Sequence, residues 1–188
     1  NHNKMKDKIF CLIPARSESK RIKNKNIINF YGKPIIAYSI IGANKSKLFE
    51  EVYVSTDSIK ISKIAKRYGA KIPFLRPKEI SSDYSCDEQV ITHFLKYMKN
   101  KKIKINILCY LYPAAPLIKV LTLKNCLKLL KKSNNTRVMT VTKTTHSIHK
   151  VLKKNKKNEM VWQNKKFIKT RSQDLEKFYQ DAGQCYWY

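Results

Sequence analysis

A basic loop over residues 15–26 carries residue types and spacing suited to phosphate chemistry. With the two residues before it, the segment reads IPARSESKRIKNKN. Arg and Lys side chains neutralise phosphate oxygens, and the N–H groups of a loop can surround them, so the segment predicts a polyphosphate site. On charge alone, a solvated basic loop is the simpler interpretation. The cations are Arg16, Lys20, Arg21, Lys23 and Lys25, and Ser17 and Ser19 add hydroxyl donors.

Five further segments accompany this loop in order along the chain. The glycine-rich phosphate motifs GxxxxGKS and GxGxxG are absent from the sequence. The six ordered blocks resemble the bacterial cytidylyltransferases that activate nonulosonic (sialic-like) acids, and the last block most resembles the pseudaminic acid branch. The five further blocks are GKPIIAYSI (32–40), VSTD (54–57), LRP (75–77), YPAAPL (112–117) and TRSQDLEKFYQDAG (170–183).

The resemblance implies an α/β fold, a Rossmann-like nucleotidyltransferase domain with a mainly parallel sheet flanked by helices. It implies the reaction of CTP with a pseudaminic or related sialic acid to give a CMP-sugar acid and pyrophosphate, for cell-surface or flagellar glycans. It also implies Mg²⁺ as cofactor and a homodimer. A 3-deoxy-manno-octulosonate cytidylyltransferase is the alternative within the same fold, and it would differ in the block at residues 171–183.

Residues of the basic loop match the family's triphosphate-binding positions. The resemblance implies that Arg16, Lys20 and Lys25 bind the phosphates and act in catalysis, with Ser19 beside them. Asn26 matches the family's nucleotide-contacting Asn. The loop is therefore expected to bind the leaving pyrophosphate.

The remaining substrate contacts are expected from two later blocks. Arg76 matches the Arg that reads cytosine, and Ser85 and Asp87 would line the base and ribose pocket. Arg171 and Gln173 fall in the sugar-acid region, where Arg171 would bind the substrate carboxylate. Two simpler interpretations stay open, because Arg76 could lie in a surface turn and Asp87 could only cap the next helix.

The chain departs from the family pattern at three places. Glu18 stands where the family usually has Gly, and a carboxylate beside a triphosphate costs Coulomb energy unless it points away. Tyr112 stands where the sialate branch has Gln. The family's metal-binding Asp-x-Asp is expected beyond Tyr188, which leaves Asp57 and Asp181 as weak metal candidates.

The elements that must position these residues are strands alternating with helices. The apolar run 9–14 predicts a central parallel strand, and the alternation predicts βαβ units in an open sheet. Ligands bind such sheets at the carboxyl ends of the strands, so the loops after Pro14, Ser55 and Tyr112 should carry the chemistry. We expect the other strands at 51–55, 71–75, 105–112, 138–141, 160–163 and 184–188, and helices from Pro34, at 58–68, at 87–99 and at 120–131.

The length of 188 residues predicts one domain, which is expected over residues 5–188. Met5 is a plausible start, which leaves residues 1–4 as an upstream extension. The aromatic segment 184–188 predicts a strand, so a further C-terminal segment is expected. No run reaches the about 20 apolar residues of a membrane span, and no signal peptide precedes the first strand, so we expect a cytoplasmic protein with no membrane partner.

The net charge of +27 raises the alternative of a basic nucleic-acid-binding protein. Only six of the 40 basic residues are Arg, and the lysines are scattered without interleaved aromatic residues. A bias toward A/T-rich codons is therefore the favoured explanation of the high lysine content. No nucleic-acid partner is expected. The five cysteines lack CxxC spacing, which argues against a zinc site or a disulfide framework. Cys11 and Cys109 lie in apolar runs and are expected in the core.

Overall fold

The computed structural model describes residues 7–19, 22–82, 85–132 and 136–188. These residues divide into two compact units. The first unit contains the described residues up to Met139 together with Gly183–Tyr188, and the second is Thr140–Ala182. Strands β6 (Val138–Lys143) and β9 (Tyr179–Trp187) each begin in one unit and end in the other.

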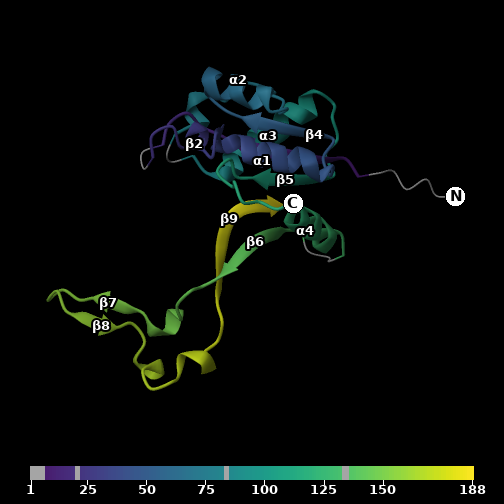
Figure 1. The fold of residues 1–188 in the computed structure, drawn as a ribbon. Coiled ribbons are helices and arrows are strands. Elements are labelled where there is room, and N and C mark those ends of the chain that lie inside the picture. The colour runs from purple at the N-terminus through teal and green to yellow at the C-terminus, as the bar shows by residue number, and fades with distance from the viewer. Residues whose placement is uncertain (1–6, 20–21, 83–84, 133–135) are drawn as a thin grey trace. The chain divides into compact units, whose positions relative to one another are not determined.

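A five-stranded sheet with the order β4–β1–β5–β9–β6 organises the fold (Figure 1). Strand β1 (Ile9–Pro14) pairs in parallel with β4 (Glu51–Ser55) and with β5 (Ile107–Leu111), and β9 pairs antiparallel with β5. The continuous apolar sequence of β1 follows from this position, since both of its faces are covered. The predicted mainly parallel sheet and α/β class are confirmed.

Side chains of β1 alternate between two cores on opposite faces of the sheet. Cys11 and Ile13 belong to one cluster, and Phe10 and Leu12 belong to the other. Helices α1, α2 and α4 cover the first cluster, whereas α3 covers the second with Val90, Phe94 and Met98. The helices are α1 (Ile35–Ser46), α2 (Ile59–Arg67), α3 (Asp87–Asn100) and α4 (Val120–Lys132).

The helix boundaries follow from local sequence signals. The Ser58 side chain accepts a hydrogen bond from the Ile61 N–H at the start of α2, and Gly69 takes a φ of +90° after its end. Pro34 was expected at the first position of a helix, but it is the residue before α1, which begins at Ile35. Cys11 and Cys109 are fully buried, as predicted, and all five cysteines are free thiols.

The predicted strand at 71–75 is wrong. Only two isolated bridges, Tyr53 to Lys71 and Thr56 to Leu75, form there. Pro73 lies between them and has no N–H to donate, so a continuous ladder cannot form. A short hairpin of β2 (Asn29–Phe30) and β3 (Lys33–Pro34) was not predicted.

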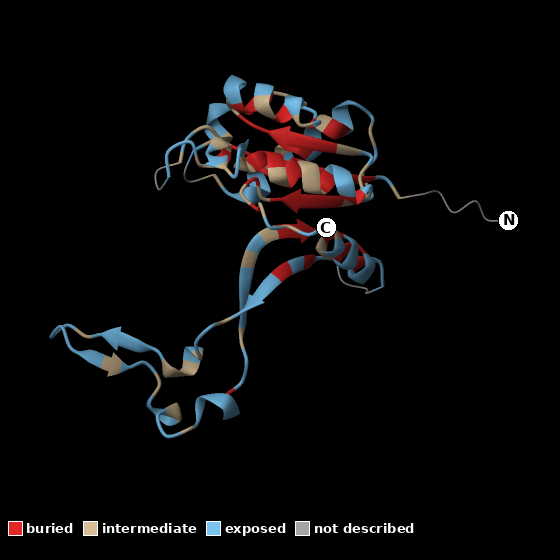
Figure 2. Cartoon of the chain, viewed as in Figure 1, coloured by how far each residue is buried: buried red, intermediate tan, exposed pale blue. Residues whose placement is uncertain are grey.

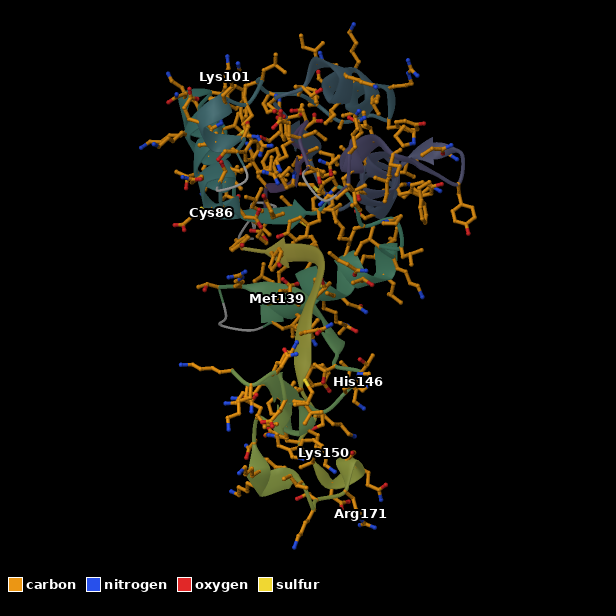
Figure 3. The ribbon with its side chains drawn as sticks, turned by 90° about the vertical axis from the view of Figure 1, so that its left-hand side faces the viewer. Cys86, Lys101, Met139, His146, Lys150 and Arg171 are labelled. Atoms are coloured by element: carbon orange, nitrogen blue, oxygen red, sulfur yellow. The ribbon has the colours of Figure 1, made fainter. Side chains whose placement is uncertain are left out.

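The second unit is mostly exposed (Figure 2). The structure describes this unit throughout, and its buried residues are Thr140 and Leu175. Its hairpin pairs β7 (Leu152–Lys154) with β8 (Met160–Trp162), of which the sequence predicted only the second strand. Figure 3 labels Lys150 and Arg171 in this unit.

Among the described residues of the whole chain, no helix has the length and apolar character needed to cross a bilayer.

Replacing Phe94 with Ala should lower the free energy of unfolding by about 3–5 kcal/mol. The Phe94 ring is fully buried and its centroid lies 5.2 Å from that of Tyr53. Urea denaturation followed by circular dichroism measures the loss. The control is Leu95→Ala, at a side chain that is 41% exposed, and it should cost less than about 1 kcal/mol. Equal losses would contradict the placement of Phe94 in the core.

Candidate functional site

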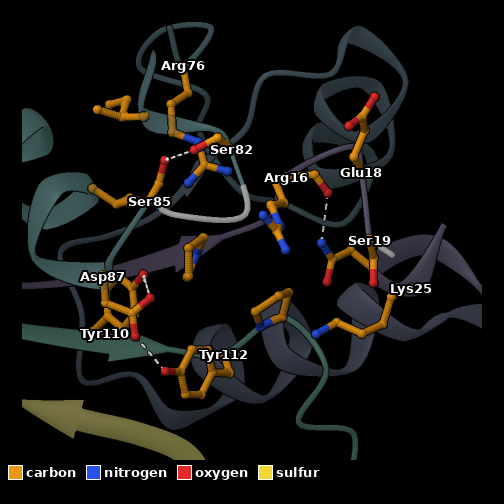
Figure 4. A pocket seen from close by; sticks show the side chains of 15 residues that line it. Arg16, Glu18, Ser19, Lys25, Arg76, Ser82, Ser85, Asp87, Tyr110 and Tyr112 are labelled. Carbon is orange, nitrogen blue, oxygen red and sulfur yellow. Dashed lines mark hydrogen bonds between the residues drawn. The ribbon is translucent and has the colours of Figure 1, made fainter. Parts of the chain in front are cut away.

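A pocket of about 260 Å³ lies at the carboxyl ends of β1 and β5, entirely within the first unit (Figure 4). The described residues that line it come from the loop after β1, from positions between Arg76 and Val90, and from the end of β5. Seven residues predicted from the sequence meet there: Arg16, Ser19, Lys25, Asn26, Arg76, Ser85 and Asp87.

The backbone of the loop after β1 is held by hydrogen bonds to β4 and to the Asn26 side chain. The Ala15 N–H donates to the Ser55 carbonyl over 2.9 Å, and the Asn26 side-chain amide donates to the Arg16 carbonyl over 2.9 Å. Asn26 is buried, and within the described part of the chain its Oδ1 atom has no hydrogen-bond partner. Asn26 therefore fixes the loop with one atom and offers an acceptor with the other.

Two cations of this loop point into the same space. The side chains of Arg16 and Lys25 project toward the middle of the pocket, whereas the Glu18 carboxylate points away from both (Figure 4). This orientation limits the Coulomb cost that Glu18 would impose on an anionic ligand. Lys20, the third predicted cation, lies outside the described residues.

Arg76 is a buried cation in the pocket wall, which excludes the surface-turn interpretation. Its side chain is only 6% exposed, and its backbone N–H donates to the Thr56 carbonyl over 2.7 Å. Burial lowers the pKa of Arg76, and the charge of Asp57 partly opposes that shift. A guanidinium remains protonated regardless, and among the described residues its Nε atom has no partner. Arg76 therefore offers a buried donor to a ligand.

Asp87 is clamped by two tyrosines. Tyr110 donates to its Oδ1 over 2.8 Å and Tyr112 donates to its Oδ2 over 2.5 Å. Burial, reinforced by Asp87, raises the pKa of both tyrosines well above the usual value, so both hydroxyls stay protonated donors. Asp87 also opens α3, where a carboxylate is stabilised by the helix dipole. Its carboxylate is thus oriented as an acceptor in the pocket wall.

Sequence reasoning did not assign the clamp. Residues two apart on a strand share a face, so positions 110 and 112 of a predicted strand fall on the side that α3 covers. That spacing, together with Asp87 at the start of the helix, is the sequence signal from which the two tyrosine hydrogen bonds could have been predicted. The segment before α3 adds Ser82, whose hydroxyl lies 3.1 Å from that of Ser85.

The sugar-acid candidates belong to the second unit. Arg171 pairs with Asp174 through two contacts of 2.7 and 3.3 Å, and Gln173 lies in the adjoining short helix Ser172–Asp174. Arg171 is largely exposed. Both residues thus belong to a different unit from the residues that line the pocket.

Neither weak metal candidate fits a metal site. Both carboxylate oxygens of Asp57 accept hydrogen bonds from Ser17, and Asp181 is an exposed residue of β9. Across the described residues, no group of three or more His, Cys, Asp or Glu side chains could hold a metal ion.

The pocket therefore combines cations with neutral and acidic hydrogen-bonding groups. Arg16 and Lys25 can neutralise an anion that bears several phosphates. Arg76, Ser85 and Asp87 offer donors and an acceptor at fixed positions, suited to a ligand whose edges carry both.

Comparisons with known proteins agree with this geometry. A family model described as Cytidylyltransferase matches residues 10–186. The chain is 38% identical over 179 residues to a pseudaminic acid cytidylyltransferase of Campylobacter jejuni, covering 95% of this chain and 77% of that one. It is 39% identical over 177 residues to a Helicobacter pylori protein named pseudaminic acid cytidylyltransferase and UDP-2,4-diacetamido-2,4,6-trideoxy-beta-L-altropyranose hydrolase, covering 94% of this chain and 34% of that one.

The fold is similar to that of a solved CMP:2-keto-3-deoxy-manno-octonic acid synthetase complexed with CTP. The TM-score is 0.66, and the match covers 97% of this chain and 74% of that one. At 18% identity, this likeness concerns the fold alone.

Replacing Asp87 with Ala should lower the free energy of unfolding by about 1–3 kcal/mol, because the fully buried Tyr110 hydroxyl loses its acceptor. Adding Tyr110→Phe to that variant should recover part of the loss, since the unpaired donor is then gone. Urea denaturation of the single and double variants measures the coupling. Glu88→Ala, in the same first turn, controls for the helix dipole. Strictly additive losses would show that the clamp contributes no coupling.

Proposed function

The chain belongs to the cytidylyltransferase family, and we propose that it transfers a CMP group from CTP to a nonulosonic acid, with pseudaminic acid as the preferred substrate. The observation that carries the proposal is the convergence of seven residues, implied by family resemblance, on one pocket that combines cations with hydrogen-bonding groups. The identity of 38% to a pseudaminic acid cytidylyltransferase supports the choice of sugar acid.

The reaction needs orientation and charge neutralisation more than covalent help. The anomeric hydroxyl oxygen forms a bond to the α-phosphorus, the bond from that phosphorus to the bridging oxygen breaks, and the hydroxyl proton is released. Pyrophosphate leaves with the electron pair. Arg16 and Lys25 would stabilise the charge on the leaving phosphates, while Arg76, Ser85 and Asp87 hold the cytidine.

The sugar acid is assigned to the second unit on family resemblance. Arg171 would bind its carboxylate, and Gln173 lies in the same block of the sequence. Because Arg171 pairs with Asp174, the incoming carboxylate would have to share or replace that partner. Replacing Asp174 as the partner would cost little free energy, since an exposed ion pair contributes only about 0–1 kcal/mol to stability.

Mg²⁺ as cofactor and a location in the cytoplasm are also proposed, both on chemical grounds. Mg²⁺ would accompany the CTP phosphates, with which it usually binds. A cytoplasmic location fits a CTP-dependent reaction and five free thiols.

A homodimer is also proposed, and the β7–β8 hairpin supports it. Leu152 pairs opposite Trp162, and Met160 is two residues from Trp162, so the three share one face of the hairpin. Their exposed fractions are 47%, 37% and 59% respectively. A second copy of the chain would cover this apolar face.

Replacing Arg16 with Ala should weaken CTP binding by about 2–3 kcal/mol, the scale of lost charge-assisted hydrogen bonds. Isothermal titration calorimetry measures the dissociation constant. Arg67→Ala removes the same charge from an exposed position on α2 outside the pocket and should leave the affinity near that of the unaltered protein. Unchanged CTP affinity in the Arg16 variant would remove the loop from the phosphate site.

CTP should be strongly preferred over UTP, and Arg76→Gln should reduce the preference. The two bases differ at a donor–acceptor edge, and a buried polar group left unpaired costs about 1–3 kcal/mol. Pyrophosphate release with pseudaminic acid and each nucleotide measures the ratio of kcat/KM values. Comparable rates with CTP and UTP in the unaltered protein would contradict the base pocket.

Changing Leu152 and Met160 together to Lys should shift the protein from dimer to monomer, because the apolar face would then carry two charges. Sedimentation velocity at micromolar concentration measures the species present. The control is Val161→Lys, since residue 161 points to the opposite face of the hairpin. A dimer that persists in the double variant would place the interface elsewhere.

Binding to nucleic acid is the rival function, suggested by the net charge of +27. Filter binding to duplex DNA across a salt series separates the two, since backbone binding gives a steep log–log slope. CTP-specific pyrophosphate release without such binding would favour the enzyme.

A further inference from the structure

Asp57 connects two loops that meet at the carboxyl edge of the sheet. It lies two residues after the end of β4. Its Oδ1 accepts the Ser17 backbone N–H over 2.7 Å, and its Oδ2 accepts the Ser17 hydroxyl over 2.6 Å. One carboxylate therefore binds both donors of one residue in the phosphate-binding loop.

These contacts complete a continuous attachment of the loop. Ala15 is held through the Ser55 carbonyl, Arg16 through the Asn26 amide, and Ser17 through Asp57. Three consecutive residues thus have fixed backbone positions, and the one in the middle is Arg16. Since Ser17 is bound on its N–H side, the peptide unit that joins it to Arg16 cannot rotate freely.

Asp57 also lies within electrostatic reach of the second pocket cation. Its charge is the largest influence that opposes the effect of burial on Arg76. A buried guanidinium needs a compensating charge, because burying an unpaired ion is costly. Asp57 therefore contacts one pocket segment directly and compensates the charge of another.

We propose that Asp57 is a positioning residue that orders the loop carrying Arg16, so that this loop binds the nucleotide triphosphate without rearrangement. This inference rests on the proposed function for the nature of the ligand. Asp57 touches no substrate in this role and acts through Ser17. By itself, the negative charge of Asp57 would weaken phosphate binding at the nearby anion site. The positioning role explains why a carboxylate is nevertheless present there.

Three variants separate hydrogen bonding from charge. Asp57→Asn removes the charge, but its amide oxygen can accept the Ser17 N–H and its NH₂ group can donate to the Ser17 hydroxyl oxygen. Asp57→Ala removes the charge and both bonds. Ser17→Ala keeps the charge and the backbone bond and removes only the bond of the hydroxyl.

Isothermal titration with CTP should rank these variants. Positioning predicts that Asp57→Ala binds CTP about tenfold or more weakly than the unaltered protein, the scale of hydrogen bonds to a charged group. Ser17→Ala should show a smaller loss, and Asp57→Asn should bind CTP as well as the unaltered protein. Electrostatics alone predicts instead that Asp57→Ala and Asp57→Asn both bind at least as tightly, so that outcome would overturn the proposal.

Thermal unfolding provides the structural control. Both Asp57 variants remove the charge that compensates Arg76, and Asp57→Ala also removes both hydrogen bonds, so its melting temperature should fall further than that of Asp57→Asn. CTP affinities are therefore compared at a temperature at which circular dichroism shows every variant to be folded, so that a difference in affinity cannot come from unfolded protein. Should Asp57→Ala fail to fold, Ser17→Ala against the unaltered protein tests the hydroxyl bond, and a CTP affinity that is not weakened would overturn the proposal.

Hydrogen exchange of residues 15–19 tests the proposal without any nucleotide. Exchange in this loop should be faster in Asp57→Ala and unchanged in Asp57→Asn. Equal protection in Asp57→Ala and the unaltered protein would overturn the positioning role, even if CTP binding is normal. An unaltered protein that orders its loop through Asp57 but binds no CTP would instead contradict the proposed function.

Discussion

Pairing of β1 to a parallel strand on each side is the constraint on which the site depends. The registers with β4 and β5 place the ends of three strands at one edge of the sheet. Cores on both faces fix β1 in that position, since its five residues from Ile9 to Ile13 are all buried. The loops that follow can therefore present side chains from distant parts of the sequence to a single pocket.

Asp57 and Asp87, two of the carboxylates near the pocket, are both held by hydroxyl donors. Asp57 accepts from Ser17, and Asp87 accepts from Tyr110 and Tyr112. A hydrogen bond at each of its two oxygens fixes the direction of each carboxylate, while each oxygen keeps a further acceptor site. Arg16 and Lys25 project into the pocket beside these carboxylates, in a protein that has 13 acidic and 40 basic residues.

Local sequence patterns predicted the elements that bury a regular face. The run at 9–14 and the spacing of Val90, Phe94 and Met98 each correspond to an observed element. The segment 71–75 was not predictable in this way, because Pro73 breaks the ladder while the apolar letters around it suggest a strand. The antiparallel direction of β9 depends on its tertiary pairing with β5, about which its own sequence carries no signal.

The same contrast holds for the site. Arg16, Lys25 and Asn26 follow one strand, so resemblance along the chain located them together. The bond from Ser17 to Asp57 joins residues 40 apart and requires knowledge that β1 and β4 are neighbours. The tyrosine clamp likewise joins the start of α3 to the end of β5, residues 23 and 25 apart. Sequence reasoning found groups of adjacent residues and missed the contacts between groups.

The exposed thiol of Cys86 allows a probe to be attached selectively beside the pocket. All five cysteines lie in the described part of the chain, and Cys86 is exposed whereas Cys11, Cys109, Cys126 and Cys185 are buried. Alkylation requires an accessible thiolate, and burial raises the pKa of the Cys109 thiol. Cys86 immediately precedes Asp87 in the pocket wall. A maleimide fluorophore would therefore attach beside the site in the native protein, without engineered cysteines, and could report ligand entry by its emission.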